Sequence, residues 1–208
     1  RYVPYLSPRW LELLDFTVRE AERRGLGVDL TLGTGWCFGG PWITTHHANV
    51  QTTNGVTFKP TMKVKRAAPG GEGWMMNPLS PAAMDAHLRP FTDAFAAYTG
   101  PRPRAVYHDS YEYRANWAPE LPAAFAARRG YPLTNELAAL FGTNRNDHVA
   151  RVKGDYLETL SDLMIEDAWP RWSEWAKERG FLTRNEAHGA PANWLDLYAL
   201  AAVPETEM

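Results

Sequence analysis

Short strand-prone runs alternate with longer helical runs along this chain. Runs with strand character span residues 27–32, 105–109, 181–186 and 200–205, and the stretches between them have apolar side chains at helical spacing. Strands that alternate with helices form a parallel sheet with right-handed crossover connections. The pattern therefore predicts an α/β fold.

The helical runs carry clear start and stop signals. A serine followed by a proline, which suits the first turn of a helix, opens the first two runs, and a glycine closes each of them. Pro170 should end or kink the longest run. Residues 44–73 alternate weakly and suggest one or two further strands. The predicted helical stretches cover residues 7–25, 80–100, 119–130, 134–141, 145–180 and 193–198.

The segments that follow the strand-prone runs are polar and rich in aromatic residues, unlike minimal turns. In (β/α) barrels the carboxyl ends of the strands carry the active site, so this pattern favours a TIM-like (β/α) barrel over an open sheet. Four or five strands do not close an eight-stranded barrel. We expect residues 1–208 to form one domain, a partial barrel.

Composition and motifs argue against several functions. The formal net charge is −2, from 22 basic and 24 acidic residues, which provides no basic surface for nucleic acid. No apolar run of about 18 residues is present to cross a membrane. The single cysteine, Cys37, excludes an internal disulfide and a cysteine-rich zinc site. Gly33-Thr34-Gly35 lacks the third glycine of a dinucleotide loop, and Ser110 lacks the flanking glycines of a nucleophile elbow. We therefore expect no nucleic acid and no membrane as partners.

Carboxylates follow three of the strand-prone runs. Asp109 and Glu112 come after the second run, Glu186 ends the third, Glu205 ends the fourth, and Glu207 follows two residues later. In a barrel these strand ends converge on one cleft. Cleavage of a glycosidic bond needs one carboxylic acid that protonates the leaving oxygen and a second carboxylate that acts as base or nucleophile. The alternative for each carboxylate is a solvated loop position or a partner for a nearby arginine.

Histidines and tryptophans near these acids are candidate sugar contacts. His108 and His188 each adjoin a candidate acid, where an imidazole could bind a hydroxyl group or orient a carboxylate, and the alternative is a packed core histidine. Trp36 and Trp42 lie in a glycine-rich loop, where their rings could stack on a sugar or pack within the loop. The late-helix tryptophans, which recur every three residues and should face the core, are Trp169, Trp172 and Trp175.

At these motifs the sequence resembles glycoside hydrolase family 106, the bacterial α-L-rhamnosidases. The resemblance covers nearly the whole chain and rests on residues 32–36, 38–42, 108–112, 184–189 and 204–207. It implies an inverting hydrolase that removes terminal α-L-rhamnose from plant-type glycans or glycosides, with two carboxylates and a calcium ion. It also implies a partial barrel within a larger glycoside hydrolase that is secreted or periplasmic, with the signal region outside this sequence.

The resemblance assigns roles to individual residues. Glu112 is similar to the general acid, and Glu205 or Glu207 is similar to either the base or part of the sugar and metal site. Family members are expected to have glutamine where this chain has Glu186, and a further carboxylate is expected downstream. The metal ligands are not assigned. The residues expected to bind substrate are Trp36, Trp42, His108, Asp109, Asn185, Glu186 and His188.

Two alternative functions stay open. One is a barrel that binds a carbohydrate without cleaving it, and the other is a barrel hydrolase with a different sugar specificity. The motifs indicate a cleft with two acids more strongly than they indicate rhamnose, because a fold hosts many functions and the site decides among them.

Overall fold

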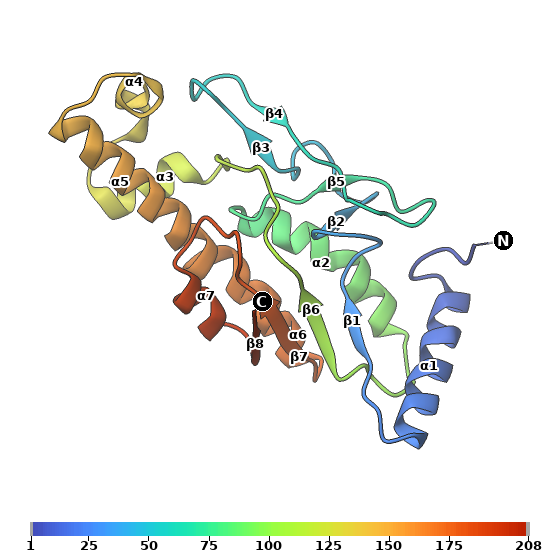
Figure 1. The fold of residues 1–208 in the computed structure, drawn as a ribbon. Coiled ribbons are helices and arrows are strands. Elements are labelled where there is room, and N and C mark those ends of the chain that lie inside the picture. The colour runs from blue at the N-terminus through green and yellow to red at the C-terminus, as the bar shows by residue number, and fades with distance from the viewer. Residues whose placement is uncertain (1, 207–208) are drawn as a thin grey trace.

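A four-stranded parallel sheet forms the centre of the computed structural model, which describes residues 2–206 (Figure 1). All three strand pairings are parallel. Each strand-prone run of the sequence contains one of these strands, so the predicted α/β fold with a parallel sheet is confirmed. In spatial order the strands are β1 (Asp29–Thr31), β6 (Ala105–His108), β7 (Leu182–Glu186) and β8 (Val203–Glu205).

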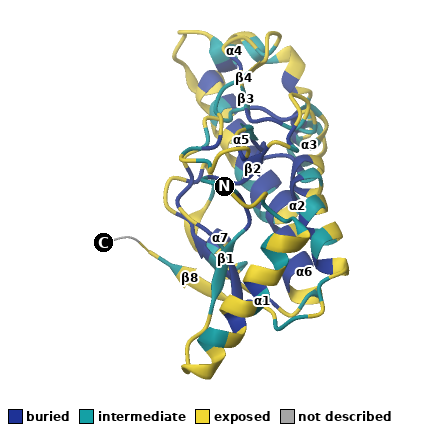
Figure 2. Ribbon diagram, turned by 90° about the vertical axis from the view of Figure 1, so that its right-hand side faces the viewer, coloured by how far each residue is buried: buried dark blue, intermediate teal, exposed yellow. Residues whose placement is uncertain are grey.

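The parallel sheet is open within residues 2–206. A TIM barrel closes with eight parallel strands, whereas here β1 and β8 each have a parallel neighbour on one side only. Figure 2 shows β8 at the edge of the sheet, where it is largely exposed. The described residues therefore form a parallel α/β sheet, and the barrel itself stays a prediction.

The helices follow the sequence signals closely. Ser7 and Ser80 cap the first two helices, because their hydroxyls accept the backbone N–H groups of Trp10 and Ala83. None of the helices in residues 2–206 has the length and apolar character that a membrane crossing requires. The α-helices are α1 (Pro8–Arg23), α2 (Pro81–Ala96), α3 (Leu121–Arg129), α4 (Leu137–Phe141), α5 (Asp147–Asp162), α6 (Trp169–Glu178) and α7 (Trp194–Ala199), and a 3₁₀ turn, η1, covers Leu133–Asn135.

The longest helical stretch changes its winding just before Pro170 and does not end there. Helix α5 passes through a π-helical turn, η2 (Leu163–Ala168), directly into α6. Proline lacks a backbone N–H and its ring crowds the preceding turn. The π turn lies immediately before α6, so the change of winding falls where proline removes a regular helical hydrogen bond.

A long excursion with two small antiparallel pairs connects β1 to α2. The pair β3 (Val50–Gln51) and β4 (Lys59–Pro60) lies in the segment for which the sequence predicts one or two strands. The pair β2 (Gly39–Gly40) and β5 (Trp74–Met75) was not predicted. A glycine pair carries no side-chain alternation, so it gives no strand signal in the sequence.

One face of the sheet packs against the helices. Along β6 and β7 the alternate residues Val106, His108, Thr183 and Asn185 are buried on this face. The His108 ring lies 4.8 Å from the ring of Trp169 on α6. The late-helix tryptophans are buried as predicted, so the helical tryptophan stripe forms the core beneath the sheet.

The opposite face carries a network of charges. Arg184, in the middle of β7, forms ion pairs with Asp29 of β1 and Glu205 of β8, and its guanidinium lies 5.4 Å from the ring centre of Tyr107. Asp29 also pairs with Arg104 at 2.5 Å. Arg104, and then Arg184, lower the pKa of the Asp29 carboxyl group. A single arginine thus links both outer strands across the sheet.

Candidate active site

Loops that follow β1, β6 and β7 meet at the carboxyl edge of the sheet. The backbone N–H of Tyr111, after β6, donates to the carbonyl of His188, after β7, at 2.7 Å. The indole N–H of Trp36, after β1, donates to the carbonyl of Ser110 at 3.1 Å. The convergence of loops expected from the sequence is therefore present at this edge, as it is in other parallel α/β folds.

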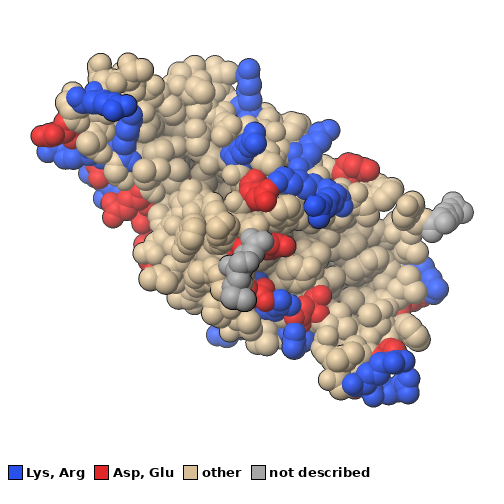
Figure 3. Space-filling view, in the orientation of Figure 1, with Lys and Arg blue, Asp and Glu red and all other residues tan. Residues whose placement is uncertain are grey.

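Glu112 lies in the loop after β6, four residues beyond His108. Its carboxylate forms an ion pair with the ammonium group of Lys65, and the two side chains are 42% and 35% exposed. The Lys65 ammonium also lies 4.7 Å from the ring centre of Trp36. Figure 3 shows acidic side chains flanked by basic ones near the centre of the face seen in Figure 1. Glu112 is thus accessible to solvent and has a cationic partner from the excursion.

The backbone around Lys65 is fixed to the loop after β1. Trp36 and Lys65 exchange two backbone hydrogen bonds, of 3.0 and 2.7 Å. A Cβ atom at Gly35 would lie 2.3 Å from the Lys65 carbonyl oxygen, so only glycine allows this approach. The glycine-rich loop therefore serves to dock the excursion closely enough for Lys65 to reach Glu112.

Gly35→Ala is expected to lower the free energy of unfolding by about 1–3 kcal/mol, because the added methyl group would overlap backbone atoms that have to shift. Thermal unfolding of the variant measures this change. Gly154→Ala in α5 is the matched control, since nothing lies within 4 Å of a Cβ there, and it should stabilise the helix by about 0.5–1 kcal/mol. An unchanged melting temperature for Gly35→Ala would mean that the loop and the excursion are less tightly docked.

Glu186 and Glu205 lie next to each other at the ends of β7 and β8. They are register partners on adjacent parallel strands, so their side chains point to the same face of the sheet. Glu186 is buried, and Glu205 forms the ion pair with Arg184, which is the alternative that the sequence left open for it. The third candidate from this region, Glu207, lies outside the described residues.

Asp109 and Asn185 differ in accessibility. Asp109 is exposed directly after β6, and its carboxylate accepts the backbone N–H of Ser110 at 2.7 Å. Asn185 is 1% exposed and accepts the hydroxyl of Tyr111 at 3.2 Å. In this arrangement Asp109 can reach a ligand, whereas Asn185 holds the loop that carries Glu112.

His108 and His188 occupy opposite environments. His108 is buried, its Nε2 lies 3.0 Å from the hydroxyl of Tyr113, and its ring meets that of Phe38 edge-on at 4.6 Å. Burial lowers the pKa of His108 to about 3, so its imidazole is neutral. His188 is exposed, beside the ring of Trp194 at 5.3 Å. His108 is thus packed in the core, which was the alternative to a sugar contact, and a contact of His108 with a sugar stays a prediction.

The two loop tryptophans are both half-buried, but they contact different parts of the structure. Trp36 is tied to Ser110 and Lys65 at the carboxyl edge. Trp42 packs on α2, where its indole N–H lies 3.4 Å from Nδ1 of His87 and its ring meets Phe91 at 5.5 Å. Trp36 is therefore the tryptophan that accompanies the candidate acid, and stacking of either ring on a sugar stays a prediction.

A small cavity of about 220 Å³ opens at the carboxyl edge, lined by Trp36, Cys37, Tyr107, His108 and Asp109 among others. Its volume is below the roughly 300–1,000 Å³ usual for a complete small-molecule site. This cavity can hold part of a ligand, and Asp109 is the exposed carboxylate in its wall.

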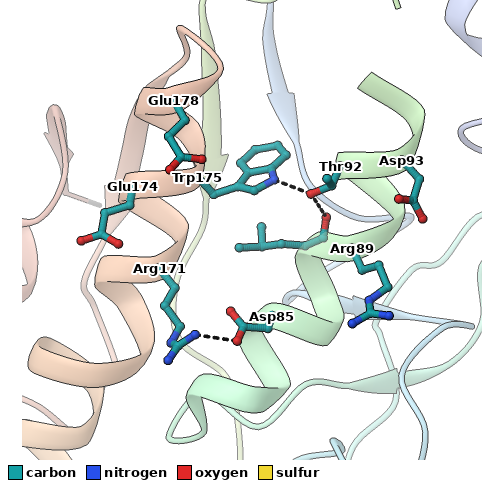
Figure 4. A pocket seen from close by; sticks show the side chains of 9 residues that line it. Asp85, Arg89, Thr92, Asp93, Arg171, Glu174, Trp175 and Glu178 are labelled. Atoms are coloured by element: carbon teal, nitrogen blue, oxygen red, sulfur yellow. Dashed lines mark hydrogen bonds and ion pairs between the residues drawn. The ribbon is translucent and has the colours of Figure 1, made fainter. Parts of the chain in front are cut away.

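A larger cavity, of about 540 Å³, lies between α2 and α6 (Figure 4). Asp85 and Arg171 face each other across it at 2.5 Å, and the indole N–H of Trp175 donates to the hydroxyl of Thr92. Its walls come from the helices, whereas the candidate acids lie on the loops at the carboxyl edge of the sheet. We therefore do not assign the catalytic site to this larger cavity.

The described residues do not form a metal site by themselves. Among residues 2–206, no three His, Cys, Asp or Glu side chains lie together in a group that could hold a metal ion. Calcium takes six to eight oxygen ligands, and some of these can come from backbone carbonyls, amide side chains and water. The calcium ion implied by the sequence resemblance stays a prediction.

Sequence reasoning missed Lys65, Tyr111 and Tyr113. Tyr111 and Tyr113 flank Glu112 and bond to Asn185 and to the backbone N–H of Phe38. Their position on either side of Glu112 was the feature of the sequence that could have identified them. Lys65 stands in a weakly alternating segment without a motif, so nothing in the sequence pairs it with Glu112.

Known proteins resemble this chain in sequence and in fold. A family model described as alpha-L-rhamnosidase, that of glycoside hydrolase family 106, matches residues 55–207. The solved structure of a rhamnosidase from Novosphingobium sp. PP1Y is similar at a TM-score of 0.61 and 24% identity, over 69% of this chain and 15% of that chain. No curated protein matches the chain. The structural likeness concerns the fold, and this chain spans about 15% of the length of that rhamnosidase.

Proposed function

Because this chain belongs to glycoside hydrolase family 106, the α-L-rhamnosidases, we propose that it forms part of the catalytic domain of an inverting α-L-rhamnosidase. The substrate class proposed is a rhamnosylated plant-type glycan or glycoside, and the proposed location is secreted or periplasmic. The observation that carries the proposal is the solvent-accessible carboxylate of Glu112 at the edge where three loops meet.

Glu112 is proposed as the general acid that protonates the glycosidic oxygen as the bond to the sugar breaks. Its neighbours Tyr111 and Tyr113 are anchored by hydrogen bonds, which leaves the Glu112 side chain directed to the exposed side of the loop. An acid in this position has access both to solvent, from which it regains its proton, and to a ligand at the carboxyl edge.

Glu205 is the described candidate for the base, with Glu207 as the other candidate. A base has to be ionised to take a proton from the attacking water, and the Glu205 carboxylate forms an ion pair with Arg184. Water would attack the side of the sugar opposite the leaving group, which inverts the anomeric centre. No step is assigned to calcium.

A second candidate function is glycan binding without hydrolysis. Both carboxylates proposed for catalysis, Glu112 and Glu205, are engaged in ion pairs. Such pairs hold the side chains as fixed hydrogen-bond acceptors, which suits recognition of sugar hydroxyls as well as catalysis.

A panel of aryl glycosides tests the proposed function on the natural full-length protein. We expect hydrolysis of an aryl α-L-rhamnoside, with the β-anomer of rhamnose as the first product in proton NMR spectra, and no release from aryl α-L-fucosides or β-D-glucosides. Turnover of another glycoside would assign a different specificity. Binding of rhamnose in calorimetry without any turnover would support the second candidate.

A further inference from the structure

Lys65 is the cationic partner of Glu112 and joins three segments at the carboxyl edge. Its ammonium group contacts the Glu112 carboxylate and lies over the ring of Trp36, at 4.7 Å from the ring centre. The side chain is 35% exposed, so it is partly shielded from solvent and from salt. Ion pairs with this degree of shelter influence the charge state of a carboxylate more than fully exposed pairs do.

The backbone of Lys65 is held from both sides. Toward the loop after β1, Lys65 exchanges two hydrogen bonds with Trp36. Toward β5, the preceding residue Val64 is buried and donates to the carbonyl of Gly73 at 3.0 Å. The ammonium group therefore reaches Glu112 from a fixed platform.

Hydrogen bonds anchor the residues that flank Glu112, and its carboxylate contacts Lys65. The residues on either side of Glu112 are anchored, because Tyr111 bonds to Asn185 and to the carbonyl of His188, and Tyr113 bonds to the backbone N–H of Phe38. These bonds fix the backbone of Glu112 but leave its carboxylate free to rotate. The Lys65 ion pair supplies the remaining constraint on the direction of the carboxylate.

We propose that Lys65 is the positioning residue of Glu112: it fixes the direction of the carboxylate and sets how readily Glu112 gives up a proton. This inference rests on the proposed function, in which Glu112 is the general acid. A neighbouring ammonium favours the ionised carboxylate, so Lys65 makes Glu112 a stronger acid and confines its protonated form to lower pH. Lys65 acts through Glu112 and transfers no proton itself.

Other ionisable groups lie at the same edge of the sheet. Asp109 lies on the same loop, His188 and Glu186 lie on the loop and strand end beside it, and Glu205 closes β8 with Arg184 as its partner. Only Lys65 has a direct contact with Glu112 among the ion pairs of residues 2–206. The effect of Lys65 is therefore separable from the others by substitution.

The test compares pH profiles of kcat/KM for Lys65→Met and Lys65→Arg in the natural full-length protein. Lys65→Met should move the alkaline limb of the profile to higher pH by about one unit, since a neighbouring opposite charge shifts a carboxyl group by about 1–3 units. It should also lower the maximum about tenfold, because the carboxyl group loses its fixed orientation. Lys65→Arg, which keeps the charge, should leave the limb close to its original pH. An alkaline limb that stays in place in Lys65→Met would overturn the proposal.

Lys63→Met is the matched control for a purely structural role. Lys63 is an exposed lysine two residues earlier, and its ammonium lies over the ring of Trp74 at 5.5 Å, but it has no contact with Glu112. Removing it should cost a similar cation–π contact and leave the pH profile unchanged. A shift of the limb in Lys63→Met equal to that in Lys65→Met would assign the effect to general surface charge and would contradict the proposal.

A direct titration separates this inference from the proposed function. Carbon-13 NMR of the Glu112 carboxyl group reports the pH at which it takes up a proton, with Glu112→Gln used to assign the signal. The midpoint should rise in Lys65→Met and stay in place in Lys63→Met, whether or not the protein hydrolyses a rhamnoside. A midpoint that does not move refutes the role of Lys65, whereas a moved midpoint without hydrolysis refutes only the proposed function.

Discussion

Glu112→Gln is expected to lower kcat for hydrolysis of an α-L-rhamnoside by about 10²- to 10⁴-fold, the usual contribution of a general acid. The amide has nearly the same shape as the carboxyl group but cannot protonate the leaving oxygen. Steady-state kinetics on the natural full-length protein measures the loss. KM should change little, because the loss concerns an interaction made in the transition state.

The leaving group provides an internal check on the role of Glu112. A strongly acidic phenol leaves an aryl rhamnoside as a phenolate ion, without taking up a proton. Glu112→Gln should therefore slow hydrolysis of such an aryl rhamnoside much less than hydrolysis of a rhamnosyl disaccharide. Equal losses of kcat on both substrates would contradict the general-acid role of Glu112 and would favour a role in binding the substrate. Glu174→Gln is the matched control, because Glu174 lines the helical cavity of Figure 4, and its activity should equal that of the unmodified protein.

The elements predicted well are those whose signal is local. The first two helices begin directly after the capping residues Ser7 and Ser80, each at a proline, and each strand-prone run contains a strand of one parallel sheet. Pro170 was expected to end or kink its helix; the helix does not end there, and a π turn lies immediately before α6, in which Pro170 is the second residue. The tryptophans of α6, which follow this turn, are buried in the core.

The features that the sequence did not predict depend on contacts between distant segments. Glu112 was identified because it follows a strand, but its partner Lys65 comes from an excursion whose path is set by the docking of backbone onto Gly35 and Gly39. The alternation of buried and exposed residues places His108 on the helix side of the sheet, which the adjacent acid in the sequence does not reveal. Local pattern thus predicts which residues reach the carboxyl edge, and tertiary packing decides which of them face solvent.

Acidification is expected to destabilise the core through two buried histidines. His87 is fully buried and His108 is 1% exposed, and Phe38 lies between them, with its ring 4.7 Å from that of His87 and 4.6 Å from that of His108. Burial lowers the pKa of each imidazole to about 3. Both histidines are therefore neutral in the folded protein at pH values where an unfolded histidine is already charged.

The sign follows from which state binds more protons. An unfolded histidine has a pKa of about 6.5, so between about pH 6.5 and about pH 3 the unfolded state binds more protons, and the free energy of unfolding falls as the pH falls. Each histidine contributes about 1.4 kcal/mol per pH unit in this window. At pH 4.5 the two together remove about 5 kcal/mol, which is comparable with the whole stability of a typical domain.

Hydrogen exchange of the β6 amides between pH 6.5 and 4.5 measures this loss in the natural full-length protein, after correction for intrinsic exchange. Carboxyl groups with ordinary pKa values of about 4 begin to take up protons in the lower half of this window, so the slope between about pH 6.5 and about pH 5.5 is the part that reports the histidines. His87→Gln keeps an acceptor near the indole N–H of Trp42 but cannot be protonated, and it should reduce the slope by about half. His148→Gln removes an exposed histidine of α5 and should leave the slope unchanged. If the pH dependence of stability in His87→Gln has the same slope as in the unmodified protein, then water reaches His87 in the folded state. The aromatic cluster around Phe38 would then be less closed than its ring contacts indicate.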